Sequence, residues 1–338
     1  MIKACYFRSL PDHKVRCGLC SHHCCILPGQ RGICGVRENR DGVLYSLNYG
    51  KLVAANVDPI EKKPFFHFLP GTTAYSIATA GCNFRCSFCQ NWEISQASKG
   101  GKPVEGTEVA PENVVRAAKT EKCASIAYTY VEPTIFFEYA YDVSVLAKKE
   151  GIKNVWVSNG FMAPKVLKSL MKKGLMDANN VDLKAFNPAF YQRFCGANLE
   201  AVKENLKLLA HSNTTWLEVT SLLIPNHNDS EEEIRAMAMF IFRELGAGVP
   251  WHVSAFYPAY KMLDVPPTPA STLVRAREIG LEVGLHYVYT GNVPGLLGES
   301  TFCPQCGELL IERQGYCVTR HDRKGVCKKC HTLLAGVF

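Results

Sequence analysis

Residues 74–92 read AYSIATAGCNFRCSFCQNW, a short apolar run followed by a loop with three cysteines. The run at 74–79 predicts a strand, and the loop spaces Cys82, Cys86 and Cys89 as C-x3-C-x2-C. Three thiolates can hold a [4Fe-4S] cluster, and they leave one of its four irons open to a ligand from outside the protein. Structural zinc would need a fourth ligand, which no nearby Cys or His supplies. The alternative is three core cysteines in a turn, but core packing gives thiols no reason to cluster within eight positions.

Downstream of this loop, β-rich runs alternate with helical patterns. Six further strands are expected at 124–129, 154–158, 178–183, 215–223, 252–256 and 286–289, and helices at 111–121, 134–149, 164–173, 199–211, 230–245 and 272–283. This alternation predicts an α/β fold of parallel βα units, arranged as a full or partial barrel or as a doubly wound sheet. No Gly-x-Gly-x-x-Gly follows the first strand, which favours the barrel over a dinucleotide-binding sheet.

The chain has 338 residues, of which 47% are apolar and 16 are cysteine. This composition excludes a disordered chain, and no Gly-X-Y period or sustained heptad indicates a fibre. Lys and Arg exceed Asp and Glu by 38 to 31, a mild excess that permits an acidic partner. Turn residues near 70–71 and 298–301 predict three modules: an N-terminal Cys-rich metal-binding segment at 1–70, a barrel at 71–300 and a C-terminal module at 301–338.

The chain starts without an apolar signal-peptide region, and its longest apolar run, 236–242, is too short to cross a bilayer. We therefore expect a soluble cytoplasmic protein without membrane contact. Because thiols stay reduced in the cytoplasm, the clustered cysteines are interpreted as metal ligands and not as disulfides.

The C-terminal module has a C-x2-C-x20-C-x2-C array formed by Cys303, Cys306, Cys327 and Cys330. The two C-x2-C motifs together supply four thiolates that can surround one ion tetrahedrally, so the spacing predicts a zinc ribbon. The segment is too short for a core of its own, and the metal would supply much of its folding energy. Its basic residues could bind nucleic acid, although a solvated ribbon surface is the more common explanation for them.

The N-terminal set comprises Cys17, Cys20, Cys24 and Cys34, with His22, His23 and Cys25 as competing ligands. Zinc and an auxiliary iron–sulfur cluster are both chemically reasonable for four thiolates. The glycines and the proline around these cysteines suit tight turns about a small tetrahedral ion, which favours zinc.

The three-cysteine loop, with the aromatic Phe88 before its last Cys, resembles the radical S-adenosylmethionine (SAM) superfamily. Further motifs narrow the resemblance to the radical SAM protein of the AmmeMemoRadiSam system, which is related to pyruvate formate-lyase-activating enzymes. These motifs are DPIEKKP at 58–64, GCN at 81–83, CQNW at 89–92, YTYVEP at 128–133, VDLK at 181–184 and YTGN at 289–292. The resemblance spans nearly the whole chain.

The resemblance implies a partial (β/α)6 TIM-like barrel with a [4Fe-4S] cluster at its C-terminal mouth. SAM would bind the open iron, and reduction of the cluster would cleave SAM to methionine and a 5′-deoxyadenosyl radical that abstracts hydrogen from a substrate.

The resemblance also assigns SAM contacts to individual residues. Glu132 stands where relatives have the last residue of a Gly-Gly-Glu motif, although Tyr130 and Val131 replace the glycines. Asp182 and Lys184 are two apart at a strand end and therefore point to one face, where they could hold SAM or form a surface ion pair. The remaining expected contacts are Phe88, Asn91, Ser158, Asn159, Ile224 and Asn226.

Three functions are compatible with these features. The first is an activating-enzyme-like oxidoreductase that abstracts hydrogen from a substrate such as a protein glycine, with flavodoxin or ferredoxin as electron donor. The second is radical SAM modification of a small molecule, peptide or RNA, together with Memo-like and AMMECR-like proteins. The third is a zinc-ribbon nucleic-acid-binding protein, which leaves the three-cysteine loop unexplained.

Overall fold

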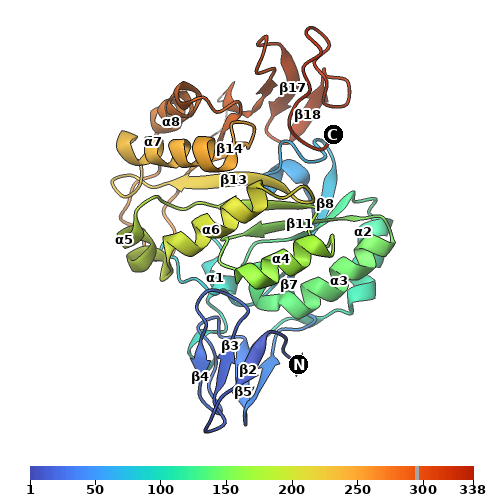
Figure 1. The fold of residues 1–338 in the computed structure, drawn as a ribbon, viewed down its shortest axis with the longest axis vertical. Helices are drawn as coiled ribbons and strands as arrows, with labels where there is room; N and C mark the ends of the chain where they lie inside the picture. The colour runs from blue at the N-terminus through green and yellow to red at the C-terminus, as the bar shows by residue number, and fades with distance from the viewer. Residues whose placement is uncertain (294–296) are drawn as a thin grey trace.

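The computed structural model describes residues 1–293 and 297–338, and a nine-stranded sheet forms its centre (Figure 1). Neighbouring strands follow the order β15-β14-β13-β12-β11-β10-β8-β7-β9, so β15 and β9 are the two edges of an open sheet. Its parallel strands are β8 (Thr73–Thr79), β10 (Ser125–Tyr128), β11 (Lys153–Ser158), β12 (Ala178–Asp182), β13 (Trp216–Leu223), β14 (Trp251–Ala255) and β15 (Val288–Gly291). They match the seven strands expected from the sequence, and the parallel α/β architecture is confirmed.

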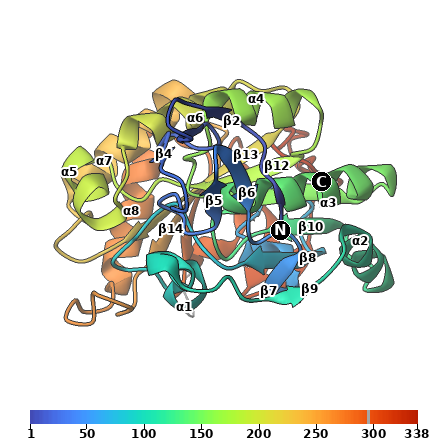
Figure 2. The same ribbon diagram turned by 90° about the horizontal axis from the view of Figure 1, so that it is seen from below.

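Helices connect successive parallel strands and form an arc along the outside of the sheet (Figure 2). They are α2 (Pro111–Thr120), α3 (Phe137–Lys149), α4 (Pro164–Lys172), α6 (Leu199–Ala210), α7 (Glu231–Phe240) and α8 (Ala270–Val283), with the short α1 (Trp92–Ser95) and α5 (Pro188–Phe190). Proline occupies the first turn of α2 and of α4, and the Ser230 hydroxyl accepts a hydrogen bond from Glu233 N at the start of α7. In the described part of the chain, no helix is long and apolar enough to span a membrane.

Two antiparallel strands extend the sheet beyond the expected barrel. β7 (Lys51–Pro59) pairs with β8, and β9 (Thr107–Glu108) pairs with β7. Because β7 lies within residues 1–70, the central sheet begins before the turn at 70–71 from which the barrel was expected to start.

Two small antiparallel sheets form the N-terminal module. One contains β1 (Ile2–Lys3), β6 (Val43–Ser46) and β5 (Arg37–Arg40), and the other contains β2 (Phe7–Ser9), β3 (Val15–Cys17) and β4 (Cys25–Ile26). The module contacts the loop after β11, where Ser21 N donates to Phe161 O and Ala163 N donates to Leu19 O, both at 3.0 Å. It therefore covers the carboxyl end of the parallel strands, in front of the sheet in Figure 2.

The C-terminal module is a three-stranded antiparallel sheet of β16 (Thr301–Phe302), β17 (Leu309–Gln314) and β18 (Cys317–Arg320). It packs at the opposite end of the barrel, against the segment that precedes β8 (Figure 1). Val337 N donates to His67 O and Leu69 N donates to Val337 O, each at 2.7 Å. The buried Arg313 guanidinium donates to Phe66 O at 2.7 Å and lies over the Phe66 ring.

A buried polar network fixes this end of the barrel. The Glu218 carboxylate on β13 accepts hydrogen bonds from the backbone N–H groups of Phe66 and His67 and from the Trp216 indole. His67 Nδ1 lies 2.6 Å from the Ala335 carbonyl, which can only accept, so Nδ1 carries a proton. His67 Nε2 lies 2.6 Å from the Tyr289 hydroxyl and accepts from it in the neutral imidazole. Burial lowers the pKa of His67 to about 4.

The contact between the C-terminal module and the barrel should weaken in acid. An unfolded histidine has a pKa of about 6.5, so the contribution of neutral His67 is complete above that pH and is lost as the pH falls toward 4. The loss should reach about 3 kcal/mol, and thermal unfolding between pH 7 and pH 4 measures it. His67→Asn retains a donor without titrating, so it should flatten this part of the pH profile. An equally steep profile in His67→Asn would contradict the assignment.

Candidate functional site

The three-cysteine loop follows β8 directly, and hydrogen bonds to a neighbouring segment fix its backbone. Arg85 N donates to Cys195 O and Ser87 N donates to Phe194 O, both at 2.9 Å. Phe84 N lies 3.4 Å from Cys82 Sγ, and the Ser95 hydroxyl on α1 lies 3.3 Å from Cys89 Sγ. The loop thus presents its cysteines at the carboxyl end of the first parallel strand, where βα folds place their sites.

The cysteines of this loop resist ionisation without a cation. Burial raises the pKa of the Cys82 and Cys89 thiols, and contact with Cys195 together with burial raises the pKa of Cys86. The Coulombic effect of Cys86 raises the pKa of both other thiols, so the three sulfurs lie within electrostatic reach of one another. Such a donor set fits a cationic iron cluster, which favours the thiolate form that burial otherwise penalises.

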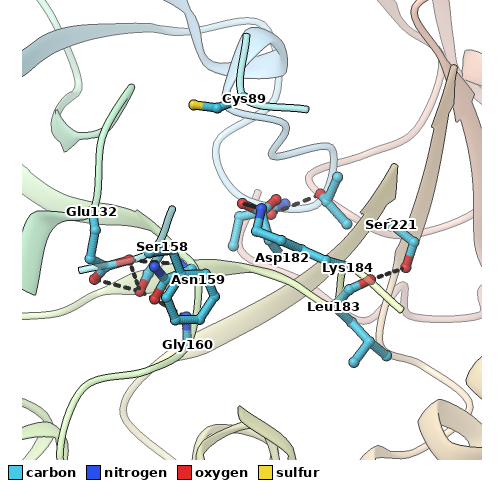
Figure 3. A network of polar contacts seen from close by, with 12 residues as sticks. Cys89, Glu132, Ser158, Asn159, Gly160, Asp182, Leu183, Lys184 and Ser221 are labelled. Carbon is cyan, nitrogen blue, oxygen red and sulfur yellow. Dashed lines mark hydrogen bonds and ion pairs between the residues drawn. The ribbon is translucent and has the colours of Figure 1, made fainter. Parts of the chain in front are cut away.

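Glu132 joins the ends of two neighbouring strands. Its carboxylate follows β10 and is 3% exposed. It accepts hydrogen bonds from Thr134 N at 3.0 Å, from the Thr134 hydroxyl, from the Ser158 hydroxyl at 3.0 Å and from Asn159 N at 2.7 Å (Figure 3). Ser158 ends β11 and Asn159 follows it. Burial raises the pKa of Glu132, and the donors from Thr134, Ser158 and Asn159 counteract that effect.

Asn159 connects these strand ends to the cysteine loop. Its side-chain Nδ2 donates to Asn83 Oδ1 at 2.8 Å, and Asn83 follows Cys82 in the chain. Its own Oδ1 accepts from Phe161 N at 3.1 Å, which orients the amide. The predicted residues Glu132, Ser158 and Asn159 therefore form one polar unit that contacts the loop with the three cysteines.

Asp182 and Lys184 form an ion pair at the end of β12, with Asp182 Oδ2 at 2.9 Å from Lys184 Nζ (Figure 3). Burial lowers the pKa of Lys184, but the Coulombic effects of Asp182, Cys86 and Cys195 outweigh burial and place the pKa well above its usual value. The ammonium also lies 5.9 Å from the centre of the Phe88 ring. The pair therefore faces the cysteine loop.

The other expected SAM contacts lie in different surroundings. Asn91 is exposed at the end of the loop, where its Nδ2 donates to Tyr130 O at 2.8 Å. Phe88 is buried against Phe190. Ile224 is buried after β13, and Asn226 lies on an exposed turn with a positive φ of 63°.

The structure adds a group of polar residues that the sequence analysis did not assign to the site. The Tyr130 hydroxyl donates to Asp58, whose carboxylate also pairs with Lys63 Nζ at 2.5 Å. Burial lowers the pKa of Lys63 to about 8, against the opposing effect of Asp58. Asp58 and Lys63 come from the DPIEKKP motif and Tyr130 from YTYVEP. The sequence analysis singled out both motifs, but the sequence does not show that their side chains are in contact. Cys195, which lies outside the three cysteine sets, is a second addition, because its side chain contacts Cys86.

The ribbon cysteines converge on one point. The sulfurs of Cys303, Cys306, Cys327 and Cys330 all lie within 4.8 Å of one another. Cys303 Sγ lies 3.5 Å from Cys330 Sγ, and Cys306 Sγ lies 3.7 Å from Cys327 Sγ. A single ion with metal–sulfur bonds of about 2.3 Å spaces tetrahedral thiolates by about 3.8 Å, so this set fits one metal ion.

The four N-terminal cysteines surround a cavity. Cys17, Cys20, Cys24 and Cys34 line it, whereas Cys25 is exposed on β4. Of the competing histidines, His22 also lines the cavity, but its Nε2 lies 2.8 Å from Asn83 O in the cysteine loop.

Comparisons with known proteins agree with this geometry. The family model described as the radical SAM superfamily matches residues 76–238. The uncharacterized protein MJ0808 of Methanocaldococcus jannaschii is 48% identical over 93% of this chain and 92% of its own length. A putative glycyl-radical enzyme activating enzyme of the same organism, MJ1227, is 26% identical over 45% of this chain and 62% of its own length.

Among solved structures, SuiB of Streptococcus suis bound to the precursor peptide SuiA has a TM-score of 0.51 with 14% identity. The match covers 69% of this chain and 51% of that chain. At this identity, the likeness concerns the fold alone.

Removing the Glu132 carboxylate should destabilise the site. Glu132→Ala leaves the buried N–H groups of Thr134 and Asn159 without an acceptor, and each unpaired donor costs about 1–3 kcal/mol. We expect the free energy of unfolding to fall by about 3 kcal/mol in a urea titration followed by tryptophan fluorescence. Glu132→Gln retains one oxygen and should lose less. Glu150→Ala, which removes an exposed partner of Lys119, is the control and should change little. Equal losses in Glu132→Ala and Glu150→Ala would contradict this role.

Proposed function

Because the chain belongs to the radical SAM superfamily and is related to its activating enzymes, we propose that it is a radical SAM enzyme that removes hydrogen from a substrate. Cys82, Cys86 and Cys89 would hold the [4Fe-4S] cluster. When bound and reduced, this cofactor cleaves SAM to methionine and the 5′-deoxyadenosyl radical. The observation that carries the proposal is the three-cysteine loop at the end of β8, flanked by the polar ends of β10, β11 and β12.

The residues around the loop bind and orient SAM. Lys184 keeps a positive charge beside Cys86, which offsets the negative charge of a thiolate-ligated site. Asp182 is the partner of Lys184 and has a third of its side chain exposed, so its free oxygen is available to hydroxyl or ammonium groups of SAM. Asn91 is exposed beside Cys89 and offers amide contacts to the SAM carboxylate. Glu132 holds the ends of β10 and β11 in register with the loop and directs negative charge toward the SAM ammonium.

For the substrate, we propose a glycine of a partner protein, as in glycyl-radical-enzyme activation. The likeness to the putative activating enzyme MJ1227 supports this class. Tyr130, whose carbonyl accepts from Asn91, is partly exposed and supplies polar groups for a peptide backbone, while the buried pair of Asp58 and Lys63 fixes its hydroxyl. Transfer of deuterium from a labelled glycyl-radical enzyme into 5′-deoxyadenosine would identify the donor, and transfer from a small molecule in its place would refute this class.

Cleavage of SAM should depend on the three-cysteine loop. After anaerobic reconstitution with iron and sulfide and reduction with dithionite, the wild-type protein should form 5′-deoxyadenosine, measured by chromatography. The variant with Cys82, Cys86 and Cys89 changed to Ala should form none, because the cluster loses all its protein ligands. Cys123→Ala is the matched control, since Cys123 lies outside all three cysteine sets, and it should retain the wild-type rate. Cleavage retained by the triple variant would refute the proposal.

We further propose that the ribbon holds zinc. Cys303→Ser with Cys330→Ser should lower the zinc content by about one atom per chain, measured by mass spectrometry of the metal. Limited proteolysis within 301–338 should accelerate, because the metal supplies folding energy to this short segment. Cys317→Ser provides the control, since Cys317 is exposed in the ribbon outside the four-sulfur group. An undiminished zinc content in the double variant would contradict the assignment.

A further inference from the structure

The cavity of the N-terminal module has the chemistry of a metal site. It is lined by the sulfur-bearing residues Cys17, Cys20, Cys24 and Cys34 and by the apolar Leu19, Ile26 and Ile33. All four cysteines line the same cavity, so their side chains face a common region. Because Cys25 is exposed and His22 contacts Asn83, the four cysteines are the ligands that the fold selects from the competing set.

The spacing of these cysteines differs from that of the ribbon. Within residues 1–293 and 297–338, only the ribbon set has three or more Cys, His or acidic donor atoms that all lie within 4.8 Å of one another. Neither the N-terminal cysteines nor Cys82, Cys86 and Cys89 form such a close group among the described residues. One zinc ion draws its thiolates to about 3.8 Å, whereas a cluster of several irons holds each thiolate on a different iron and farther apart. The turn-rich sequence around these cysteines favoured zinc. Their arrangement in the structure favours an iron–sulfur cluster.

Two buried N–H groups offer further support. Asn83 and Arg37 both line the cavity, and among the described residues Asn83 Nδ2 and Arg37 Nε are buried without a hydrogen-bond partner. Buried donors are normally paired, so each unpaired donor indicates an acceptor that completes the site. The sulfides and thiolates of an iron–sulfur cluster are such acceptors, and hydrogen bonds to sulfur tune these clusters.

From these observations we propose that Cys17, Cys20, Cys24 and Cys34 bind a second [4Fe-4S] cluster. Four thiolates leave no iron open, so this cluster has no position for SAM and can only accept and release electrons. Asn83 and Arg37 donate hydrogen bonds to it.

The N-terminal site adjoins the three-cysteine loop. His22, two residues after Cys20, lies 2.8 Å by its Nε2 from the carbonyl of Asn83, which follows Cys82. On the other side, the Ser98 hydroxyl donates to Cys34 O at 3.4 Å. Next to Ser98, Lys99 Nζ donates to Phe84 O in the three-cysteine loop at 2.6 Å. A single hydrogen bond, between His22 and Asn83, thus links the segments that carry the two sets of cysteines.

The position defines a role in electron supply, which rests on the proposed function. A reduced low-potential protein of the flavodoxin or ferredoxin class gives one electron to the N-terminal cluster. The oxidised cluster becomes reduced, then returns to its oxidised state as the electron passes to the site at Cys82, Cys86 and Cys89. No bond forms or breaks, and no proton moves. Half-exposed Ile33 and the partly exposed Cys20 and Cys24 place the cluster close to the surface that a donor reaches.

Metal content of the full-length protein tests the site. After anaerobic reconstitution, the wild type should hold about eight irons per chain, and Cys20→Ser with Cys24→Ser should hold about four. Cys25→Ser, which changes the exposed neighbouring cysteine, should match the wild type. Iron that is undiminished in the double variant, with zinc lower by about one atom per chain, would overturn the proposal in favour of zinc.

A second measurement does not depend on the folding of that variant. The Cys82, Cys86 and Cys89 to Ala variant isolates the N-terminal site, and electron paramagnetic resonance after dithionite reduction should show one [4Fe-4S] signal. Absence of iron from this variant would overturn the proposal. If both clusters are present in the wild type and SAM is not cleaved, the proposed function fails while the second cluster stands.

The electron-supply role has its own readout. Reduction of the site at Cys82, Cys86 and Cys89 by reduced flavodoxin, followed by rapid-freeze paramagnetic resonance, should be at least about tenfold slower in Cys20→Ser with Cys24→Ser than in Cys25→Ser. An equal rate in the two variants would overturn the role in electron supply.

Discussion

The buried carboxylate of Glu132 is the interaction on which the candidate site depends. It collects backbone and hydroxyl donors from the ends of β10 and β11, and Asn159 extends this contact to Asn83 in the cysteine loop. Parallel strands end in loops whose relative positions the sheet alone does not fix. A charged acceptor in a region of low dielectric forms strong hydrogen bonds, so it holds these loops together. The same burial makes the group costly to leave unpaired, and this explains why four donors surround it.

The two flanking modules close opposite ends of the barrel. The N-terminal module contacts the loops after β8 and β11, while the C-terminal module contacts the segment before β8 through Val337 and Arg313. The first of these ends carries the polar groups at which charged ligands can bind. The second is filled by Glu218, His67 and Tyr289, whose hydrogen bonds are directed at one another. The barrel can therefore bind charged ligands at one end, while a hydrogen-bonded network stabilises the other end.

The sequence predicted the parallel strands well, because short apolar runs between amphipathic helices leave few alternatives. The sequence analysis did not predict β7. An antiparallel strand before the first βα unit has no sequence pattern that distinguishes it from an extended loop. For the site, Cys82, Glu132 and Asp182 could be placed at strand ends from the sequence. The contact of Tyr130 with Asp58 could not, because it joins positions 72 residues apart through side chains whose directions depend on the completed sheet. The convergence of the four N-terminal cysteines on one cavity is likewise a tertiary property.

The contact of the last residues with the barrel has a consequence for how the chain tolerates shortening. Val337 is hydrogen-bonded on both sides to the 67–69 segment, and the Phe338 ring packs against Gly325 and Arg320. Removal of residues 335–338 by a peptidase would expose the backbone of His67 and Leu69 and leave the His67 imidazole without its Ala335 acceptor. Removal of a few residues from this terminus would therefore loosen the packing at one end of the barrel, although the candidate site lies at the opposite end.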